Sequence, residues 1–253
     1  MRYLFSSAGK QSLEGTVAGK CLLAFDFDGT LAPITGKPSQ ARLRKNTETL
    51  LDQLAHLYPV AVLSGRGVAD LTGRLPAGLH SYIGNHGFEG LLSAQRKYAG
   101  AEKICAAWHF VLTGLFSSHG FDDVFLENKR YSLAVHYRNS RQPLRRRREL
   151  LAFCSILSPA PRILPGKFVV NLIPPKLPNK GDALKELLRL VKAPKAIYVG
   201  DDDTDEDVFR LRLPNVLSVS VGRRKGSNAN FYLRDQSETL RLLREILRLS
   251  RST

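Results

Sequence analysis

The chain has 253 residues, of which 43% are hydrophobic and 24% charged, with a formal net charge of +15. This length suits one large or two small domains, and the hydrophobic share excludes a wholly disordered chain. No apolar run reaches the ~18 residues of a membrane-spanning helix, and the N-terminal apolar stretch is too short for a signal peptide. The scattered residues Cys21, Cys105 and Cys154 lack metal-site spacing and indicate reduced thiols. We therefore expect a soluble, cytoplasmic protein.

Strands and helices are predicted to alternate over the first third of the chain. The apolar run at 21–27 predicts a strand, and 46–57 predicts a helix with Leu50, Leu54 and Leu57 at helical spacing. A strand, a short helix and another strand are then predicted at 59–65, 68–75 and 80–87. This βαβαβ order favours a parallel sheet with helices on both faces.

The middle of the chain has a different pattern. A helix is predicted around 102–116, the alternating segment 123–138 predicts strands, a second helix follows, and 162–175 predicts a hairpin or strand pair. A helix–strand–strand unit that occurs twice suggests an antiparallel sheet with its own helical layer.

The βα alternation then returns. The predicted elements are a helix at 180–191, a strand at 195–203, a helix at 205–212, a strand at 215–222, and a C-terminal helix with Leu240, Leu243 and Leu247 on its apolar side. The simplest arrangement is one parallel-sheet domain interrupted by an inserted domain.

Much of the positive charge is local, because six arginines lie between Arg138 and Arg148. The helix predicted there has a plausible buried stripe of Leu150, Leu151, Cys154 and Leu157. Its arginines would then lie mostly in solvent, and a solvated helix face is the favoured interpretation. A nucleic-acid or polyanion binder is the alternative from another functional class, but no aromatic-interleaved basic strand or reader motif supports it.

Polar residues follow four of the predicted strands, and chemistry in parallel sheets gathers at such carboxyl ends. They are Asp26 and Asp28 after the first strand, Ser64 after the second, Asn85 and His86 after the third, and Asp201, Asp202, Asp203 and Asp205 after the late strand. The strand period of two places Asp26 and Asp28 on the same side. A cluster of aspartates would be unstable without a cation, and hard oxygen ligands with no His or Cys cluster point to Mg²⁺.

Mg²⁺ held by a few carboxylates usually shares its ligand sphere with a phosphate. Lys180, just before a helix, and Ser64 with Gly65, just after a strand, are sensible phosphate donors. A carboxylate can attack phosphorus, and a second one two residues on can protonate the leaving oxygen and then activate water. Taken singly, the features are weak: a D-x-D pair is often a turn, and the acidic loop at 200–207 lacks the glycine-bearing calcium-loop pattern.

The ordered set is more specific than its parts. Strand–DFDGT, LSG, a lysine at a helix start and strand–GDDxTDE together resemble the haloacid-dehalogenase-like phosphatase superfamily. The resemblance implies an α/β fold, with a Rossmann-like parallel-sheet core (1–98 and 176–253) and an inserted α+β cap domain with an antiparallel sheet (99–175). It implies that Asp26 is the nucleophile, Asp28 the general acid/base, and Ser64 and Lys180 the phosphate-holding residues.

The same resemblance implies the metal site. Mg²⁺ would bind Asp201, a carboxylate oxygen of Asp26 and the backbone carbonyl of Asp28. Asp202 and Asp205 would order the waters on the metal and the position of Lys180.

Further motifs, among them "GNHGFE", "LENKRYSLAVHYR" and "GKFVVNLIPP", resemble the trehalose-6-phosphate phosphatase family. This implies a small sugar phosphate as partner and a cap that closes over the sugar. A nucleic-acid partner is disfavoured, no membrane partner is expected, and the oligomeric state is not predicted. The implied substrate-binding residues are Gly65, Arg66, His86, Glu89, Glu127, Lys129, Arg138, Lys167 and Asn171. Asn171 stands where the family pattern usually has Glu. The sugar therefore stays open between trehalose 6-phosphate and a related compound such as sucrose phosphate or a glycosylglycerol phosphate.

Overall fold

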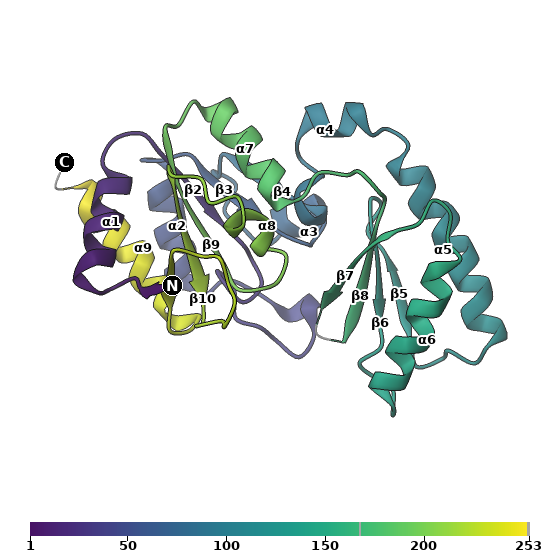
Figure 1. Cartoon of the computed structure of the whole chain (residues 1–253). Coiled ribbons are helices and arrows are strands. Elements are labelled where there is room, and N and C mark those ends of the chain that lie inside the picture. Colours follow the sequence, from purple (N-terminus) through teal and green to yellow (C-terminus); the bar gives the residue numbers. More distant parts are fainter. Residues whose placement is uncertain (167, 252–253) are drawn as a thin grey trace. The chain divides into compact units, whose positions relative to one another are not determined.

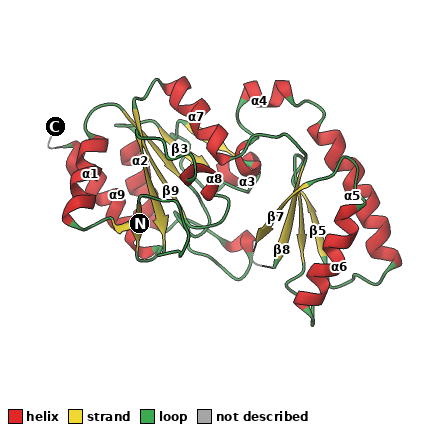
Figure 2. Ribbon diagram, viewed as in Figure 1, coloured by secondary structure: helices red, strands yellow, loops and turns green. Residues whose placement is uncertain are grey.

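The computed structural model describes residues 1–166 and 168–251. Its chain divides into two compact units, one made of Met1–Gly90 and Pro178–Thr253, the other of Leu91–Leu177. Each unit is built on its own sheet, as Figure 1 and Figure 2 show. The second unit is thus an insertion into the chain of the first.

The sheet of the first unit has seven strands, and every neighbouring pair is parallel. In spatial order they are β1 (Arg2–Tyr3), β11 (Phe231–Leu233), β10 (Val216–Val221), β9 (Lys195–Gly200), β2 (Cys21–Phe25), β3 (Val60–Leu63) and β4 (Ser81–Ile83). The central strands are buried almost throughout, as strands covered on both faces must be. The predicted parallel sheet is confirmed.

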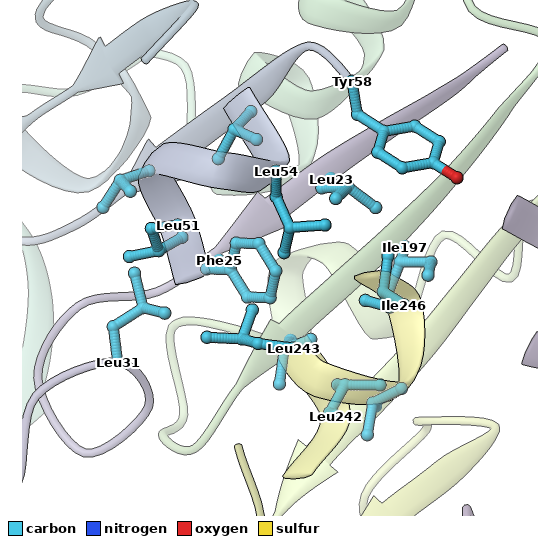
Figure 3. Close-up of a cluster of buried hydrophobic side chains, with 14 of the residues drawn as sticks. Leu23, Phe25, Leu31, Leu51, Leu54, Tyr58, Ile197, Leu242, Leu243 and Ile246 are labelled. Carbon is cyan, nitrogen blue, oxygen red and sulfur yellow. The ribbon is translucent and has the colours of Figure 1, made fainter. Parts of the chain in front are cut away.

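Helices cover this sheet on both faces (Figure 1). They are α1 (Ser7–Val17), α2 (Lys45–Ala55), α3 (Val68–Thr72), α7 (Lys180–Val191), α8 (Glu206–Phe209) and α9 (Ser237–Ser250), with short 3-10 turns η1 (Pro38–Gln40) and η2 (Asn85–Gly87). Helices α1, α2 and α9 pack on one face of the sheet. Figure 3 shows this core, where Phe25 and Ile197 of the sheet lie among Leu54 of α2 and Leu243 of α9.

Two predicted helical stripes are displaced from the observed ones. Helix α2 ends at Ala55, so Leu57 lies beyond it and is 53% exposed. In α9 the fully buried positions include Leu242 and Ile246 beside Leu243, whereas Leu247 is only partly buried. The apolar stripe of a helix is broader than three leucines, and packing decides which edge of it faces the core. The elements β1, α1 and β11 were not predicted. Strands β1 and β11 are too short for their sequence to show a period of two.

The second unit contains a four-stranded antiparallel sheet, and this prediction is confirmed. Its spatial order is β5 (Phe125–Asn128), β6 (Leu133–His136), β8 (Val169–Ile173) and β7 (Arg162–Gly166), and its helices are α4 (Leu92–Lys97), α5 (Ala101–Ser118) and α6 (Pro143–Ser155). One face of the sheet packs against α5 and α6, through Leu133 and Val170 among others, around Trp108. The strand period of two turns the alternate residues to the opposite face.

The arginine-rich helix α6 buries the predicted stripe. Leu150, Cys154 and Leu157 are buried, and Leu151 packs at the edge of the same core. Of its four arginines, Arg145 and Arg148 are exposed and the other two are partly buried. The Arg146 guanidinium lies 4.0 Å from the Phe121 ring centre and within 3.0 Å of Asp123 and Glu149.

The three cysteines are unbridged and buried. Among the described residues, none of the helices combines the length and the apolar character that crossing a membrane would require.

Candidate active site

The strand order reverses direction between β2 and β9. From β2 the sheet continues through β3 and β4, and from β9 it continues through β10 and β11 on the other side. The backbone N–H of Asp26 donates to the carbonyl of Val199 at 2.8 Å, so the two strands end side by side. Asp26 and Asp201 therefore follow neighbouring strand ends at the switch point, where open α/β sheets bind their ligands.

Lys180 begins α7 beneath this edge and is 1% exposed. The helix start is fixed by a capping box, in which the Asn179 side chain accepts from the Asp182 N–H and the Asp182 carboxylate accepts from the Asn179 N–H. The Lys180 ammonium donates to Asp26 Oδ1 at 2.7 Å and to Asp205 Oδ1 at 2.8 Å. One buried cation thus joins the first and the last acidic motif of the chain.

Three carboxylates gather here in a cluster that suits a hard cation. One oxygen from each of Asp26, Asp201 and Asp205 lies within 4.8 Å of the other two. Asp205 also accepts from the Tyr198 hydroxyl at 2.6 Å and from the Asp202 N–H at 2.9 Å. Since its oxygens are occupied, Asp205 is placed to hold Lys180 and the loop.

The pKa shifts of the clustered side chains reflect the negative charge concentrated at this site. Burial raises the pKa of Asp26 well above its ordinary value, against the opposing effect of Lys180 and with the support of Asp205 and Asp201. Burial and the neighbouring Asp205 and Asp202 raise the pKa of Asp201 to about 7. Burial alone would lower the pKa of Lys180, but Asp205 and Asp26 raise it well above its usual range, so this ammonium stays charged. One lysine is too little positive charge for such a cluster, and a bound cation would restore the ionised state of the carboxylates.

Asp28, two residues after Asp26, is held by Arg66. The guanidinium donates to both Asp28 oxygens, at 2.6 and 2.7 Å, and also to Asp70 and to the Pro38 carbonyl. Asp28 is 41% exposed, whereas the Arg66 side chain is 9% exposed and lies over the Phe27 ring. A fork-to-fork pair of this kind fixes both the position and the orientation of the carboxylate.

The candidate phosphate-holding residue after β3 and the candidate substrate-binding residues after β4 lie in tight turns. Ser64 is 1% exposed, follows β3, and accepts from the Arg66 N–H at 3.2 Å. His86 is buried against Gly65, where a Cβ would come within 2.5 Å of its ring. The Glu89 carboxylate accepts from the Val68 N–H and from the Asn85 amide, each at 2.8 Å, and so braces the loop.

The predicted sugar-binding residues of the second unit lie on its sheet. Glu127 and Asn171 are cross-strand neighbours of Ala134 on the face opposite α5 and α6. Lys129 lies 4.0 Å from Glu127, and the Asn171 amide donates to the Leu164 carbonyl at 3.4 Å. Arg138 follows β6 after Tyr137, and Lys167 lies outside the described residues.

Three residues of the site were missed from the sequence. Tyr198 holds Asp205, the Thr30 hydroxyl donates to Asp201 at 3.3 Å, and Thr204 donates to Asp202 from both its N–H and its hydroxyl. Tyr198 carried a usable signal, because a tyrosine hydroxyl buried in a central strand needs a hydrogen-bond partner.

The parallel-sheet core with its inserted antiparallel unit, and the carboxylates gathered at the switch point, have the architecture of the haloacid-dehalogenase-like class. The model of the trehalose-phosphatase family matches residues 24–237, most of the chain. The chain belongs to this family, and the resemblance inferred from its motifs is confirmed.

Curated relatives and solved structures agree. The trehalose-phosphate phosphatase of Mycobacterium tuberculosis is 36% identical over 220 residues, which cover 82% of this chain and 55% of the relative. That of Mycobacterium marinum is 32% identical with the same coverage. The chain thus spans about half the length of the curated relatives it matches.

Among solved structures, the C-terminal domain of the C. albicans trehalose-6-phosphate phosphatase superposes with a TM-score of 0.74 at 21% identity, covering 94% of this chain and 96% of that one. The Aspergillus fumigatus trehalose-6-phosphate phosphatase gives 0.65 at 24% identity, with 96% and 98% covered. At these identities the structures support the fold.

Proposed function

We propose that this chain is a Mg²⁺-dependent phosphatase that hydrolyses trehalose 6-phosphate to trehalose and phosphate. The observation that carries the proposal is the buried ammonium of Lys180, which joins Asp26 to Asp205 at the switch point of the sheet. Membership of the trehalose-phosphatase family supports trehalose 6-phosphate as the substrate.

The proposed reaction uses two carboxylates in turn. An oxygen of Asp26 attacks phosphorus, the bond from phosphorus to the sugar oxygen breaks, and the Asp28 carboxyl gives its proton to that oxygen. Asp28 then takes a proton from water, which attacks phosphorus, and the bond to Asp26 breaks to free phosphate. Lys180 and Ser64 hold the phosphoryl oxygens, which suits their place at a helix start and after a strand.

The donor set fits Mg²⁺, because the buried Asp26 and Asp205 and the partly buried Asp201 offer carboxylate oxygens, the hard ligands that this ion prefers. Asp26 and Asp201 would hold the ion together with the backbone carbonyl of Asp28, while Asp202 and Asp205 order the surroundings. When bound, the ion supplies positive charge to the phosphoryl group and to the carboxylates.

Arg66 sets a condition on this chemistry. Because it occupies both oxygens of Asp28, proton transfer requires that one of these hydrogen bonds be exchanged for the substrate oxygen or for water. Arg66 then acts as a positioning residue that keeps Asp28 next to Asp26.

The two units have different roles in the proposal. The first provides catalysis, and the second selects the sugar through Glu127, Lys129, Arg138 and Asn171, with Lys167 as a further candidate. Glu127 and Asn171, on the same face of the four-stranded sheet, support this division, since carboxylate and amide groups form directional hydrogen bonds to sugar hydroxyls.

The test is phosphate release with Mg²⁺ from trehalose 6-phosphate, sucrose 6-phosphate, glucosylglycerol phosphate, glucose 6-phosphate and an aryl phosphate. We expect the highest kcat/KM for trehalose 6-phosphate. The variant Asp26→Asn should lose activity by a factor on the order of 10³ or more, because the amide is a poor nucleophile. The matched control is Asp52→Asn, which changes an exposed carboxylate on α2.

A higher kcat/KM for another glycosyl phosphate would identify that compound as the substrate and indicate Asn171 as the cause of the difference. Substantial activity in Asp26→Asn, with Asp52→Asn unchanged, would refute the nucleophile assignment.

A further inference from the structure

The face of the four-stranded sheet opposite α5 and α6 carries an exposed aromatic side chain at its edge. Phe125 is the first residue of the edge strand β5 and is 63% exposed. Its cross-strand partner is His136 of β6, and the two rings are stacked, with centres 5.8 Å apart and planes 30° from parallel. A single exposed aromatic ring is common on protein surfaces, so the significance of Phe125 depends on the groups around it.

Phe125 lies on the face of the sheet opposite α5 and α6. Its neighbour Leu126 packs with the core under α5 and α6, so the strand period turns Phe125 and Glu127 to the opposite face. That face also carries Asn171. An aromatic ring beside carboxylate and amide groups is the usual chemistry of a carbohydrate site: the ring faces the C–H surface of a pyranose and the polar groups take its hydroxyls.

The hydrogen bond of His136 restrains the imidazole ring against which Phe125 stacks. The His136 ring nitrogen Nε2 donates to Glu127 Oε2 at 2.9 Å, which fixes the imidazole plane against which Phe125 stacks. A ring held in this way loses little conformational freedom when a ligand packs on it, which favours binding.

We infer that Phe125, supported by His136, is a specificity-determining residue that stacks on a pyranose ring of the substrate. The inference rests on the proposed function, since it takes the ligand to be a glycosyl phosphate. The ring makes no contact with the phosphoryl group in this scheme, so it acts on sugar binding and leaves the chemical step alone.

The decisive experiment compares Phe125→Ala, Phe125→Leu and Phe125→Trp with the wild type. For trehalose 6-phosphate we expect Phe125→Ala to raise KM about three- to tenfold, the range that an aromatic contact commonly contributes. Phe125→Leu should raise KM similarly, Phe125→Trp should stay within about twofold of wild type, and kcat should change less than about twofold in all three. The inhibition constant of inorganic phosphate, which carries no sugar, should stay constant.

The matched control is Phe110→Ala. Phe110 is 82% exposed on α5 of the same unit, so its replacement removes an even more exposed ring from a helix. We expect its KM to equal that of wild type. Thermal midpoints of all variants verify the fold, and if Phe125→Ala is destabilised, the Leu and Trp variants decide.

An unchanged KM in Phe125→Ala, or equal losses in the Trp and Leu variants, would overturn the inference while leaving the proposed function intact. A weaker inhibition by phosphate in parallel with KM would also overturn it, because the effect would then not belong to the sugar. A wild type that turns over no glycosyl phosphate would refute the proposed function, and the inference with it.

Discussion

The ammonium of Lys180 lies 2.7 Å from Asp26, and both side chains are almost completely buried. Two residues 154 positions apart in the sequence therefore share one buried ion pair. Removing one partner of such a pair leaves an uncompensated charge in a low-dielectric interior, which is far more damaging than losing a surface contact. The pair makes the integrity of the site and the stability of the first unit interdependent.

The first prediction concerns this pair. We expect Lys180→Met to abolish phosphatase activity and to lower the free energy of unfolding by about 3–5 kcal/mol near pH 8. The loss should be smaller near pH 5, because Asp26 and Asp205, whose pKa values burial already raises, can then take up protons. Urea unfolding of the wild type and of Lys180→Met at the two pH values measures this loss of stability.

The control for this prediction is Lys185→Met on the same helix, whose ammonium is exposed and 3.6 Å from Asp182. It should change stability by less than about 1 kcal/mol. Equal losses in the two variants would show that the buried pair has no special role.

The second prediction concerns the hydroxyl of Tyr198. Tyr198→Phe removes a 2.6 Å hydrogen bond to the buried Asp205 and should lower the free energy of unfolding by about 1–3 kcal/mol. Tyr232→Phe serves as the control, because the Tyr232 hydroxyl has no hydrogen bond within the part of the chain that the structure describes. Differential scanning calorimetry should separate the two variants, and indistinguishable thermal midpoints would contradict the prediction.

The third prediction uses two glycines with the same backbone conformation. Gly29 and Gly19 both have φ of +83°, so an L side chain is strained at either position. A Cβ at Gly29 would lie 2.2 Å from Asp201 Oδ2, whereas a Cβ at Gly19 meets nothing within 4 Å. Gly29→Ala should therefore displace Asp201 and abolish most activity, while Gly19→Ala should lose only about 1 kcal/mol of stability.

The phosphatase activities of Gly29→Ala and Gly19→Ala, measured at a temperature at which both variants are folded, test this prediction. Full activity in Gly29→Ala would mean that the position of Asp201 is not critical, and the metal-site assignment would fail with it.

The fourth prediction concerns pH and Mg²⁺. Burial, Asp205 and Asp202 raise the pKa of Asp201 to about 7, so between the unfolded pKa near 4 and this value the folded state binds the proton more strongly. In that window the metal-free protein loses stability as pH rises, and Mg²⁺ must displace the proton to bind. Saturating Mg²⁺ should therefore raise the thermal midpoint more near pH 8 than near pH 6.

Thermal shifts with and without EDTA at the two pH values measure this effect. In Asp201→Asn, which cannot titrate, the midpoint shift should be small at both. A wild-type shift that is larger at the lower pH would reverse the assigned sign and rule out competition between the proton and the metal at this carboxylate.

Several parts of the site follow from the sequence because they depend on local pattern. Apolar runs of strand length identify buried strands, and the period of two places Asp26 and Asp28 on one side of the first of them. The change from βα alternation to paired alternating strands marks the insertion. The ordered motifs around Asp26, Ser64, Lys180 and Asp201 identify the class, since their order is a property of the chain itself.

Other parts were decided only by tertiary structure, because they depend on which strands become neighbours. Strand β9 lies beside β2, and this adjacency brings Asp201 and Asp205 close to Asp26. No local sequence pattern predicts which strands become neighbours. Nor does a local pattern reveal that Arg66 holds Asp28, or that the hydroxyl of Tyr198 supports Asp205. Contacts between side chains distant in sequence arise from packing, which fills space according to the whole fold. The candidate catalytic residues can thus be named from the sequence, while the contacts that hold them in position are determined by the folded structure.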